Sequence, residues 1–586
     1  MRRALLSLVA CVVLLAATSA SASTAGGPKL PLGHAGRWIT DASGRVYVTH
    51  GINMVYKLPP YYPAAIGFGD NDAAFLRSIG FTAVRVGVLW EAVEPQPGVY
   101  DDSYLNQIAA TVATLAAHGI TSLLDFHQDL FNEKFQGEGE PAWAVQDGGL
   151  PNPTLGFPGN YLANPALEAT LDHFWQNSAG PGGVGLQDRY AAAWAHVAAR
   201  FKAVPGVLGY EIFNEPFPGT LWEPCAVPTG CPAFDAQLGR LYARVIPAIR
   251  AVDPRPLIFY EPNVLFNDGP DTLLPRFADK RLGFAFHDYC LTEPNTGPTG
   301  CSTFDDLVFS NAVKRADSTG DALLETEFGA TNDIPYLDDG VALADSRMVP
   351  WLEWAYCGCM DPTTSGPGAK QAIVLDPAKP PVGSNLVLGT LKALVEPYPQ
   401  LVAGTPLHWS YAAATRTFTA SWSTARAAGG GAFPAGSRTE IAAPALAYPE
   451  GYAVEVQGGR ILSAPGAPTI AIASCPGVEF VSVTVFGTGP DLQTCAAPPR
   501  TGLIRLRLAL SRTRLRAGVP VVLAVRVTAA GRAVKGVLVT VGRYRARTDA
   551  HGVARLHVRF RTPGRRTVLA RARGARSAVA RLTVIR

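Results

Sequence analysis

The stretch VLGYEIFNEP, residues 207–216, places an amide, a carboxylate and a proline directly after a run of large apolar residues. Such a run of β-branched and aromatic residues is typical of a buried strand. Glutamate is seldom buried unless it has a partner. The ending Asn214-Glu215-Pro216 therefore indicates a strand whose carboxyl end carries a functional group.

Seven similar runs occur between residues 46 and 357, and stretches of helical period separate them. Eight strands that alternate with helices predict an α/β fold, a (β/α)8 TIM barrel. A doubly wound open sheet is the alternative, but no Gly-rich phosphate loop opens a helix here. The eight runs are VYVTHGINMVY, TAVRVGVLW, TSLLDFHQD, VLGYEIFNE, PLIFYEP, LGFAFHDYC, ALLETEFG and VPWLEWAYC.

Composition changes twice after the predicted barrel, which we expect to occupy residues 36–402 and to end in a helix that spans roughly residues 385–404. Residues 403–498 contain short strand-like pieces between Gly, Pro and Ala turns, a pattern that predicts a β-sandwich. In residues 499–586 arginine occupies alternating positions, as in IRLRLAL and ARLHVRF. One apolar and one cationic face per strand predict a basic immunoglobulin-like β domain.

The amino terminus has two arginines, then an apolar run from Ala4 to Ala17, then small residues. This order is typical of a secretory signal peptide, residues 1–22, and predicts a secreted, extracellular protein. An uncleaved membrane anchor is the alternative, but the run is short for a span of about 20 residues.

Eight cysteines follow this leader, and an even number in an exported chain favours disulfides over metal ligation. Cys357-Gly-Cys359 lacks the spacing and partners of a zinc site, so no metal is predicted. Spacing alone does not fix the connectivity. The other close pairs are Cys225/Cys231, Cys290/Cys301 and Cys475/Cys495.

Charge divides the chain into two parts. From Arg500 onward, 22 Lys and Arg accompany a single acid, Asp549, whereas the rest of the chain carries 29 basic and 46 acidic residues. The split suggests a separate body with its own partner, an anionic membrane or cell-wall surface. A merely solvated cationic face is the alternative. Nucleic acid is not expected, because the chain is exported and lacks a base-stacking aromatic array.

Glu327 ends the seventh strand-like run much as Glu215 ends the fourth. Chemistry in such barrels lies at the carboxyl ends of the strands, and glycosidic cleavage needs a protonated and an ionised carboxyl there. A gap of roughly 5 Å gives retention of configuration and a wider gap gives inversion, which sequence cannot distinguish. A turn or helix cap is the alternative for either glutamate alone. Glu211 and Glu325 lie deeper in the same strands, where we expect structural hydrogen bonds.

IFNEP and TEFG resemble the acid/base and nucleophile strands of glycoside hydrolase family 5, which belongs to a retaining clan. The resemblance implies that Glu215 is the acid/base, that Glu327 is the nucleophile and that Asn214 binds the sugar 2-hydroxyl. It further implies that Arg85 supports the nucleophile. It also implies that substrate is bound by His127 of the third strand, by His287 and Tyr289 of the sixth strand, and by Trp354 of the eighth strand, on which a sugar stacks.

A narrower resemblance, to the endoglycoceramidase group of that family, rests on GINMVYKLPPYYP, LLDFHQDLFNEKFQGEGEPAWA and GYEIFNEPFPG. It implies release of the oligosaccharide from ceramide in glycosphingolipids, with Lys57, Asp125 and Asp129 binding the glucose next to ceramide. No cofactor is implied, and we expect a monomer. The alternatives are an endo-galactosylceramidase, a glucosylceramide or steryl glucosidase, a polysaccharide endoglucanase, or a non-catalytic glycan- or lipid-binding protein.

Residues 130–186 form a connection too long for an ordinary loop, which predicts a binding loop. Its aromatic side chains could stack on sugars or meet acyl chains. The alternative for each one is packing of the loop onto the barrel. The six are Phe131, Phe135, Trp143, Phe157, Tyr161 and Trp175.

Overall fold

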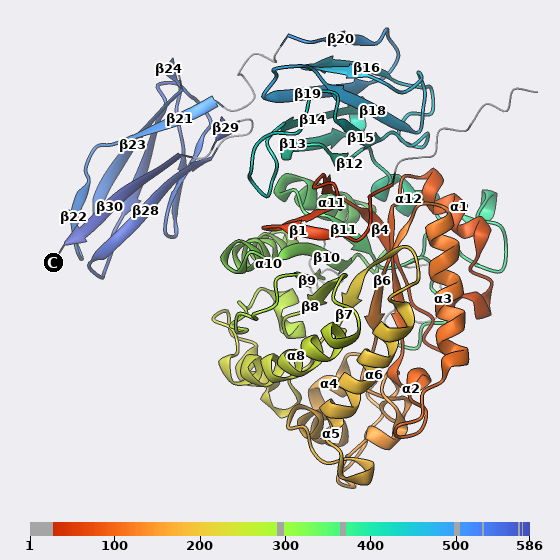
Figure 1. The fold of residues 1–586 in the computed structure, drawn as a ribbon. Coiled ribbons are helices and arrows are strands. Elements are labelled where there is room, and N and C mark those ends of the chain that lie inside the picture. Colours follow the sequence, from red (N-terminus) through yellow and green to blue (C-terminus); the bar gives the residue numbers. More distant parts are fainter. Residues whose placement is uncertain are drawn as a thin grey trace, which may run out of the picture.

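The computed structural model describes residues 27–289, 298–363, 371–496, 504–529, 532–571, 575–576 and 578–585. These residues form a barrel, a β-sandwich beside it and a second β domain at the carboxyl end (Figure 1). The predicted signal peptide lies outside the described residues. In the part of the chain that is described, no helix is long and apolar enough to cross a membrane.

The eight strand-like runs each supply one strand of a closed parallel barrel, in the order β10-β11-β4-β5-β6-β7-β8-β9. The predicted (β/α)8 fold is thereby confirmed. The runs are rich in apolar residues because strands of a parallel barrel are buried on both faces. The strands are β4 (His50–Met54), β5 (Ala83–Val88), β6 (Thr121–Phe126), β7 (Val207–Glu211), β8 (Leu257–Tyr260), β9 (Leu282–Asp288), β10 (Ala322–Phe328) and β11 (Trp351–Glu353).

Helices surround this barrel and connect most of its strands (Figure 1). Between β8 and β9 only the 3-10 helix η6 (Val264–Asp268) occurs. The longest connection, from β6 to β7, carries three α-helices and three short 3-10 helices. The helices are α1 (Asp70–Ser78), α2 (Trp90–Val93), α3 (Asp102–Ala117), α4 (Gly159–Ala163), α5 (Pro165–Trp175), α6 (Leu186–Phe201), α7 (Trp222–Cys225), α8 (Pro232–Val252), α10 (Pro298–Thr319), α11 (Ile334–Arg347) and α12 (Leu388–Leu394).

The β-sandwich is built from strands that precede the barrel in sequence and from strands that follow it. Its larger sheet has the order β1-β2-β3-β12-β15-β18-β17 and its smaller sheet β13-β14-β19-β16-β20. The strands are β1 (Gly33–Ala35), β2 (Trp38–Thr40), β3 (Val46–Tyr47), β12 (Pro399–Val402), β13 (Thr405–Ala412), β14 (Thr417–Ser423), β15 (Arg438–Ala442), β16 (Ala453–Gln457), β17 (Gly459–Ile461), β18 (Thr469–Ser474), β19 (Phe480–Phe486) and β20 (Leu492–Thr494).

Two expectations about element bounds are wrong here. The run at residues 46–56 supplies two strands, because Val46–Tyr47 pairs with β12 of the sandwich and only His50–Met54 enters the barrel. The last helix ends at Leu394, since Pro397 and Pro399 lack the amide hydrogens that a helix needs, and residues 399–402 form β12 instead.

The amino-terminal strands also close the floor of the barrel. Leu32 and Ile39 belong to a buried cluster with the inward-facing residues Leu208, Leu257 and Leu324 of three barrel strands. This apolar floor seals the end opposite to the carboxyl ends of the strands.

The carboxyl-terminal domain has two sheets around its own apolar core, which fits the predicted immunoglobulin-like sandwich. One sheet has the order β24-β23-β21-β29 with β27 beside β23, and the other β22-β30-β28-β25-β26. The strands are β21 (Ile504–Leu510), β22 (Arg514–Arg516), β23 (Val521–Ala529), β24 (Arg532–Ala533), β25 (Leu538–Val541), β26 (Tyr544–Arg547), β27 (Val553–Val558), β28 (Gly564–Arg571), β29 (Ala575–Arg576) and β30 (Ala578–Ile585).

Disulfides join cysteines that are close in sequence. Three are described: Cys225–Cys231, Cys357–Cys359 and Cys475–Cys495. The pair Cys290/Cys301 lies outside the described residues, because Cys290 and the side chain of Cys301 are not among them. Cys225 and Cys231 are buried at the start of α8, where their disulfide closes a loop of the barrel.

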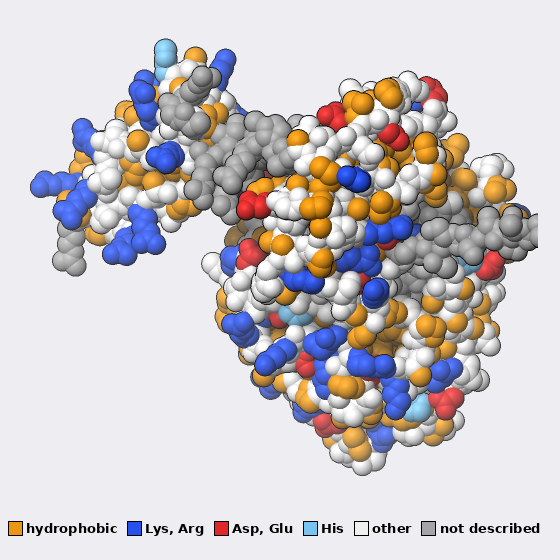
Figure 2. Space-filling view, turned by 45° about the horizontal axis from the view of Figure 1, so that its top comes forward, with side chains coloured by type: hydrophobic (Ala, Val, Ile, Leu, Met, Phe, Trp, Pro, Cys, Tyr) orange, Lys and Arg blue, Asp and Glu red, His pale blue; other side chains and the backbone are white. Residues whose placement is uncertain are grey.

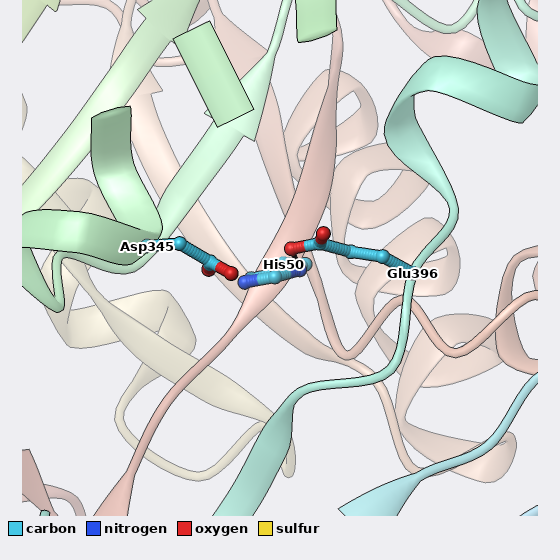
Figure 3. Close-up of side chains that lie close together, drawn as sticks. All are labelled: His50, Asp345 and Glu396. Carbon is cyan, nitrogen blue, oxygen red and sulfur yellow. Dashed lines mark ion pairs between the residues drawn. The ribbon is translucent and has the colours of Figure 1, made fainter. Parts of the chain in front are cut away.

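A buried polar cluster lies at the junction of barrel and sandwich. The ring of His50, at the start of β4, is stacked between Trp351 and Tyr398, with centroids 4.2 and 3.7 Å away. Figure 3 shows the carboxyl groups of Asp345 and Glu396 turned toward this ring from two different segments. Burial raises the pKa of both carboxyls, the neighbouring Asp345 raises that of Glu396 further, and burial lowers the pKa of His50. The cluster is therefore uncharged or nearly so when folded.

We expect Glu396→Gln to reduce the loss of stability that the protein suffers as pH rises. In the unfolded chain this carboxyl ionises at a pKa of about 4.3, whereas its folded pKa is well above that value. Unfolding above about pH 4 therefore releases a proton, so stability falls with rising pH until the folded pKa is reached, by up to about 1.4 kcal/mol per unit. Glutamine cannot ionise.

Thermal melting between pH 5 and pH 8 measures the effect. The melting temperature of the wild type should fall more steeply than that of Glu396→Gln. Glu450→Gln, at an exposed glutamate of the sandwich, serves as the control and should follow the wild type. Parallel curves for Glu396→Gln and the wild type would refute the expected release of a proton on unfolding.

Candidate active site

Every barrel strand, or the residues just after it, supplies a polar or aromatic side chain to one connected cluster. Register brings several of these side chains together, since Asn53 pairs with Arg85 and Glu327 pairs with His287 across neighbouring strands. The cluster includes all eleven residues that the sequence predicted for the site. One contribution from each strand, in chain order, is Asn53, Arg85, Asp125, Glu215, Glu261, His287, Glu327 and Trp354.

Arg85, on β5, lies at the centre of the cluster and is fully buried. Its Nε donates to Glu211 Oε2 at 2.5 Å, and its terminal nitrogens contact Asn214 Oδ1 at 2.8 Å and Asp125 Oδ1 at 3.0 Å. A further hydrogen bond goes to Glu327 Oε1. Burial opposes its charge, but the surrounding carboxylates hold the pKa of Arg85 well above its ordinary value. Arg85 is thus a permanent cation.

Glu327 is the penultimate residue of β10, where a register shift between Glu325 and Glu327 interrupts the pairing with β9. Such an irregularity re-aims the side chains that follow it. Both carboxylate oxygens of Glu327 have donors, because Oε1 accepts from Arg85 and Oε2 accepts from the Tyr289 hydroxyl at 2.8 Å. These two donors fix the orientation of the carboxylate.

Glu215 does not end β7, as the sequence suggested, because the strand stops at Glu211. Glu215 follows four residues later in the left-handed conformation, with φ of 45°. Its Oε1 accepts from Asn267 Nδ2 at 3.1 Å and lies 2.9 Å from His287 Nδ1. Burial and then the charge of Asp129 raise the pKa of Glu215 to about 7. Glu215 can therefore hold a proton at neutral pH.

A second charged group surrounds Lys57, which follows β4. Its Nζ donates to Asp129 and lies 3.2 Å from Asp361 and 3.6 Å from Glu138. Lys57 is the cation that these carboxylates share, so the pKa of Asp129 is lowered despite burial. Burial raises the pKa of Glu138 well above its ordinary value, which leaves Glu138 protonated.

His127 and Trp354 connect the two groups. His127 Nδ1 lies 2.8 Å from Asp125 Oδ2, and its ring is stacked on Trp354 with centroids 5.2 Å apart. Lys57 Nζ lies 4.6 Å from the centroid of the same tryptophan. Asp125 contacts both Arg85 and His127 and has no exposed side-chain surface. These contacts let Asp125 hold Arg85 and His127 in place, and its contact with a sugar stays a prediction.

Sequence reasoning missed several members of the cluster. Asn53 donates to the carbonyl of Thr326, 2.9 Å away, and accepts from Arg85. Glu261 follows β8 and lies 3.5 Å from Arg85, and burial raises its pKa well above the ordinary value. The run IFYEP, which ends in Glu-Pro as IFNEP does, could have revealed Glu261. Asn267 lies in η6 and had no comparable signal.

The two glutamates that the sequence set aside have structural surroundings. Glu211 bonds Arg85, as the expected structural role requires. Glu325 is buried near Asp288 and Asp305, which raises its pKa well above the ordinary range.

The aromatic residues of the long connection mostly pack inward. Four of the six are buried and belong to the barrel's main apolar cluster, and the other two are partly buried against it. Packing onto the barrel, the alternative weighed for each, therefore describes them better than stacking on a ligand. The buried four are Phe131, Phe135, Tyr161 and Trp175, and the partly buried two are Trp143 and Phe157.

The two predicted catalytic carboxyls face each other. A carboxylate oxygen of Glu215, a ring nitrogen of His287 and a carboxylate oxygen of Glu327 all lie within 4.8 Å of one another. One carboxyl has a raised pKa and the other has two fixed donors. A protonated acid next to an ionised carboxylate is the arrangement that glycoside hydrolysis uses.

Comparison with known families agrees with this geometry. Residues 44–359 match the family model described as Cellulase (glycosyl hydrolase family 5), and residues 397–485 match the glycoside hydrolase family 5 C-terminal domain. The chain belongs to glycoside hydrolase family 5. It is a glycosidase, and the match covers the barrel and most of the sandwich.

Several similar proteins are named as endoglycoceramidases. Endoglycoceramidase I of Rhodococcus hoagii (strain 103S) is 34% identical over 472 residues, which span 78% of this chain and 86% of the relative. Solved structures of endo-glycoceramidase II from Rhodococcus sp. include a lactosyl-enzyme intermediate, 27% identical with a TM-score of 0.63, and a complex with ganglioside GM3, 26% identical with a TM-score of 0.65. Each covers 77% of this chain and 99% of the solved chain.

The raised pKa of Glu215 generates a prediction for the pH dependence of hydrolysis. If Glu215 delivers the proton, kcat/KM should fall as pH rises through about 7, because the acid form is lost. Asp129→Asn should move this basic limb to lower pH, since one negative charge near Glu215 is removed. Asp361→Asn removes a different carboxylate from Lys57 and should leave the limb in place. A limb that Asp129→Asn leaves unmoved would contradict the assigned cause.

Proposed function

We propose that this family 5 enzyme hydrolyses the bond between the glycan and ceramide in glycosphingolipids. The similarity to endoglycoceramidase I over 78% of the chain carries the proposal. The group around Lys57 supports it, because charge-assisted hydrogen bonds from ammonium and carboxylate groups can fix sugar hydroxyls. Asn214 precedes Glu215 and is held by Arg85 and by the Gln128 carbonyl, which supports a role for it in binding the sugar next to Glu215.

The proposed mechanism is a double displacement. Glu327 attacks the anomeric carbon and forms a glycosyl ester, while Glu215 donates its proton to the departing ceramide oxygen. Glu215, now ionised, then takes a proton from water, whose oxygen displaces Glu327 and leaves the sugar with its original configuration. The short approach of Glu215 and Glu327 favours this retaining course over inversion, which needs roughly 6.5–9.5 Å between the carboxyls.

Neighbouring groups support the two steps. Arg85 and Tyr289 stabilise the Glu327 carboxylate before attack and when it is released again. Burial lowers the pKa of His287 to about 4, so its ring is neutral and brings no positive charge next to Glu215. Lys57 lies against the ring of Trp354, and we infer that a sugar bound next to Lys57 stacks on this ring.

We also propose that the protein is secreted and acts outside the cell. The leader at residues 1–22 supports export, and the disulfides are those of an oxidising compartment. A mature amino terminus at Ser23 is the expected result of sequencing the exported protein. The basic domain would then face anionic surfaces outside the cell.

Replacing Glu327 with Gln should lower kcat by at least about 10³-fold on every substrate, because an amide cannot form the glycosyl ester. Glu215→Gln should cost less on an aryl glycoside whose leaving group needs no proton than on a glycolipid. Proton NMR of the first-formed sugar should show retained configuration. An inverted product, or full activity of Glu327→Gln, would exclude the double displacement.

A substrate panel tests the substrate class. The purified protein should release intact oligosaccharide and ceramide from a ganglioside in detergent, as measured by mass spectrometry of both products. Cellulose, glucosylceramide and a 6-galactosyl-series glycolipid serve as comparisons, with Glu327→Gln as the inactive control. Activity confined to cellulose would overturn the proposal, and activity confined to one of the other lipids would reassign the substrate.

A further inference from the structure

The carboxyl-terminal domain carries a cationic surface that the hydrolytic site does not use. Its residues follow the segments that match family 5, which end at residue 485. Figure 2 shows Lys and Arg side chains projecting from the described part of this domain. Buried and exposed positions alternate along its strands, so each arginine can be assigned to one face.

Seven exposed arginines share the outer face of the sheet β22-β30-β28-β25-β26. Their neighbours along the strands, such as Val539, Val568 and Leu582, point into the core. Pairing places Arg571 and Arg547 on the two sides of Leu538, and Arg514 and Arg565 on the two sides of Thr583. We name this set the arginine face: Arg514, Arg516, Arg545, Arg547, Arg565, Arg571 and Arg581.

No carboxylate neutralises the arginine face within the described part of the domain. Asp549, the only acid after Arg500, pairs with Arg555 of β27 at 2.8 Å, and β27 belongs to the opposite sheet. Positive charge therefore accumulates on the outer face of this sheet, where like charges repel one another. An anionic partner would relieve this repulsion.

The apolar residues on the same face narrow the kind of partner. Val579 and Ile585, both on β30, are 62% and 40% exposed among the arginines. Guanidinium groups bind phosphates in a bidentate manner, and exposed aliphatic side chains suit the boundary between headgroups and acyl chains. No aromatic residue stands among the outward positions of these strands to stack on bases.

We propose that the arginine face binds the anionic phospholipid surface of a bilayer and holds the barrel close to glycolipid in that bilayer. The proposal rests on the proposed function, because a lipid-embedded substrate gives such binding its use. Each arginine near an anionic membrane contributes about 1 kcal/mol, so seven can give binding without a transmembrane segment.

Cosedimentation of the full-length protein with vesicles free of glycolipid tests the arginine face. Vesicles of phosphatidylcholine and phosphatidylglycerol (3:1) should bind the protein, and pure phosphatidylcholine should not. The triple variant Arg565→Gln/Arg571→Gln/Arg581→Gln should bind at least about tenfold more weakly. The control Arg507→Gln/Arg526→Gln/Arg555→Gln removes the same charge from the opposite sheet and should retain most binding.

Equal losses in both triple variants would overturn the assignment to this face. Binding to duplex DNA or an acidic polysaccharide, with none to the vesicles, would overturn the lipid partner.

The wild type offers a test that needs no variant, because raising the salt to 0.5 M should release it from vesicles. Hydrolysis of ganglioside in detergent should be unchanged in the first triple variant. Vesicle binding by a protein that fails to hydrolyse ganglioside would refute the proposed function and leave the arginine face standing.

Discussion

The architecture of the site depends on one buried guanidinium. Arg85 has no exposed surface, yet its planar fork contacts side chains from β4, β6, β7 and β10 at once. Breaking a buried charge pair by removing one partner costs about 3–5 kcal/mol, so each of these carboxylates must stay in place for the barrel to hold Arg85. Because Glu327 is one of these carboxylates, the same contact sets the position of its side chain. The orientation of the nucleophile is therefore a consequence of how the barrel neutralises a charge inside itself.

An excess of carboxyls around few cations explains why the acids differ in proton affinity. Arg85 and Lys57 cannot neutralise every acid near them, so some must remain protonated. Asp129 lies against Lys57 and has a lowered pKa, whereas Glu138 and Glu261, farther from the cations, have raised ones. Glu215 has no arginine or lysine in direct contact, and its pKa is raised to about 7. Burial and then the charge of Asp129 cause this rise, whereas Glu327 differs from Glu215 in being held directly by Arg85.

The barrel and the pair of catalytic carboxyls could be predicted because they leave local patterns. Eight apolar runs show the strands, and polar residues at their ends, such as Glu215 and Glu327, stand out against them. Three features left no such trace. The split of residues 46–56 between two sheets depends on the pairing of Tyr47 with Leu401 of β12, 354 residues away in sequence. The irregular ends of β7 and β10 are backbone adjustments, and Asn267 reaches Glu215 through a tertiary contact.

The uneven charge of the chain reflects two opposed requirements, carboxyls at the site and arginines for binding to an anionic membrane. The site needs many carboxyls, and residues before Arg500 carry 46 acids against 29 basic residues. A body with this balance is repelled by the negative surface that anionic lipids create. Arginines added near the site would pair with its acids and alter their proton affinities. A separate domain avoids this conflict, because charges beyond a Debye length of about 8 Å are screened from the site while still attracting a membrane.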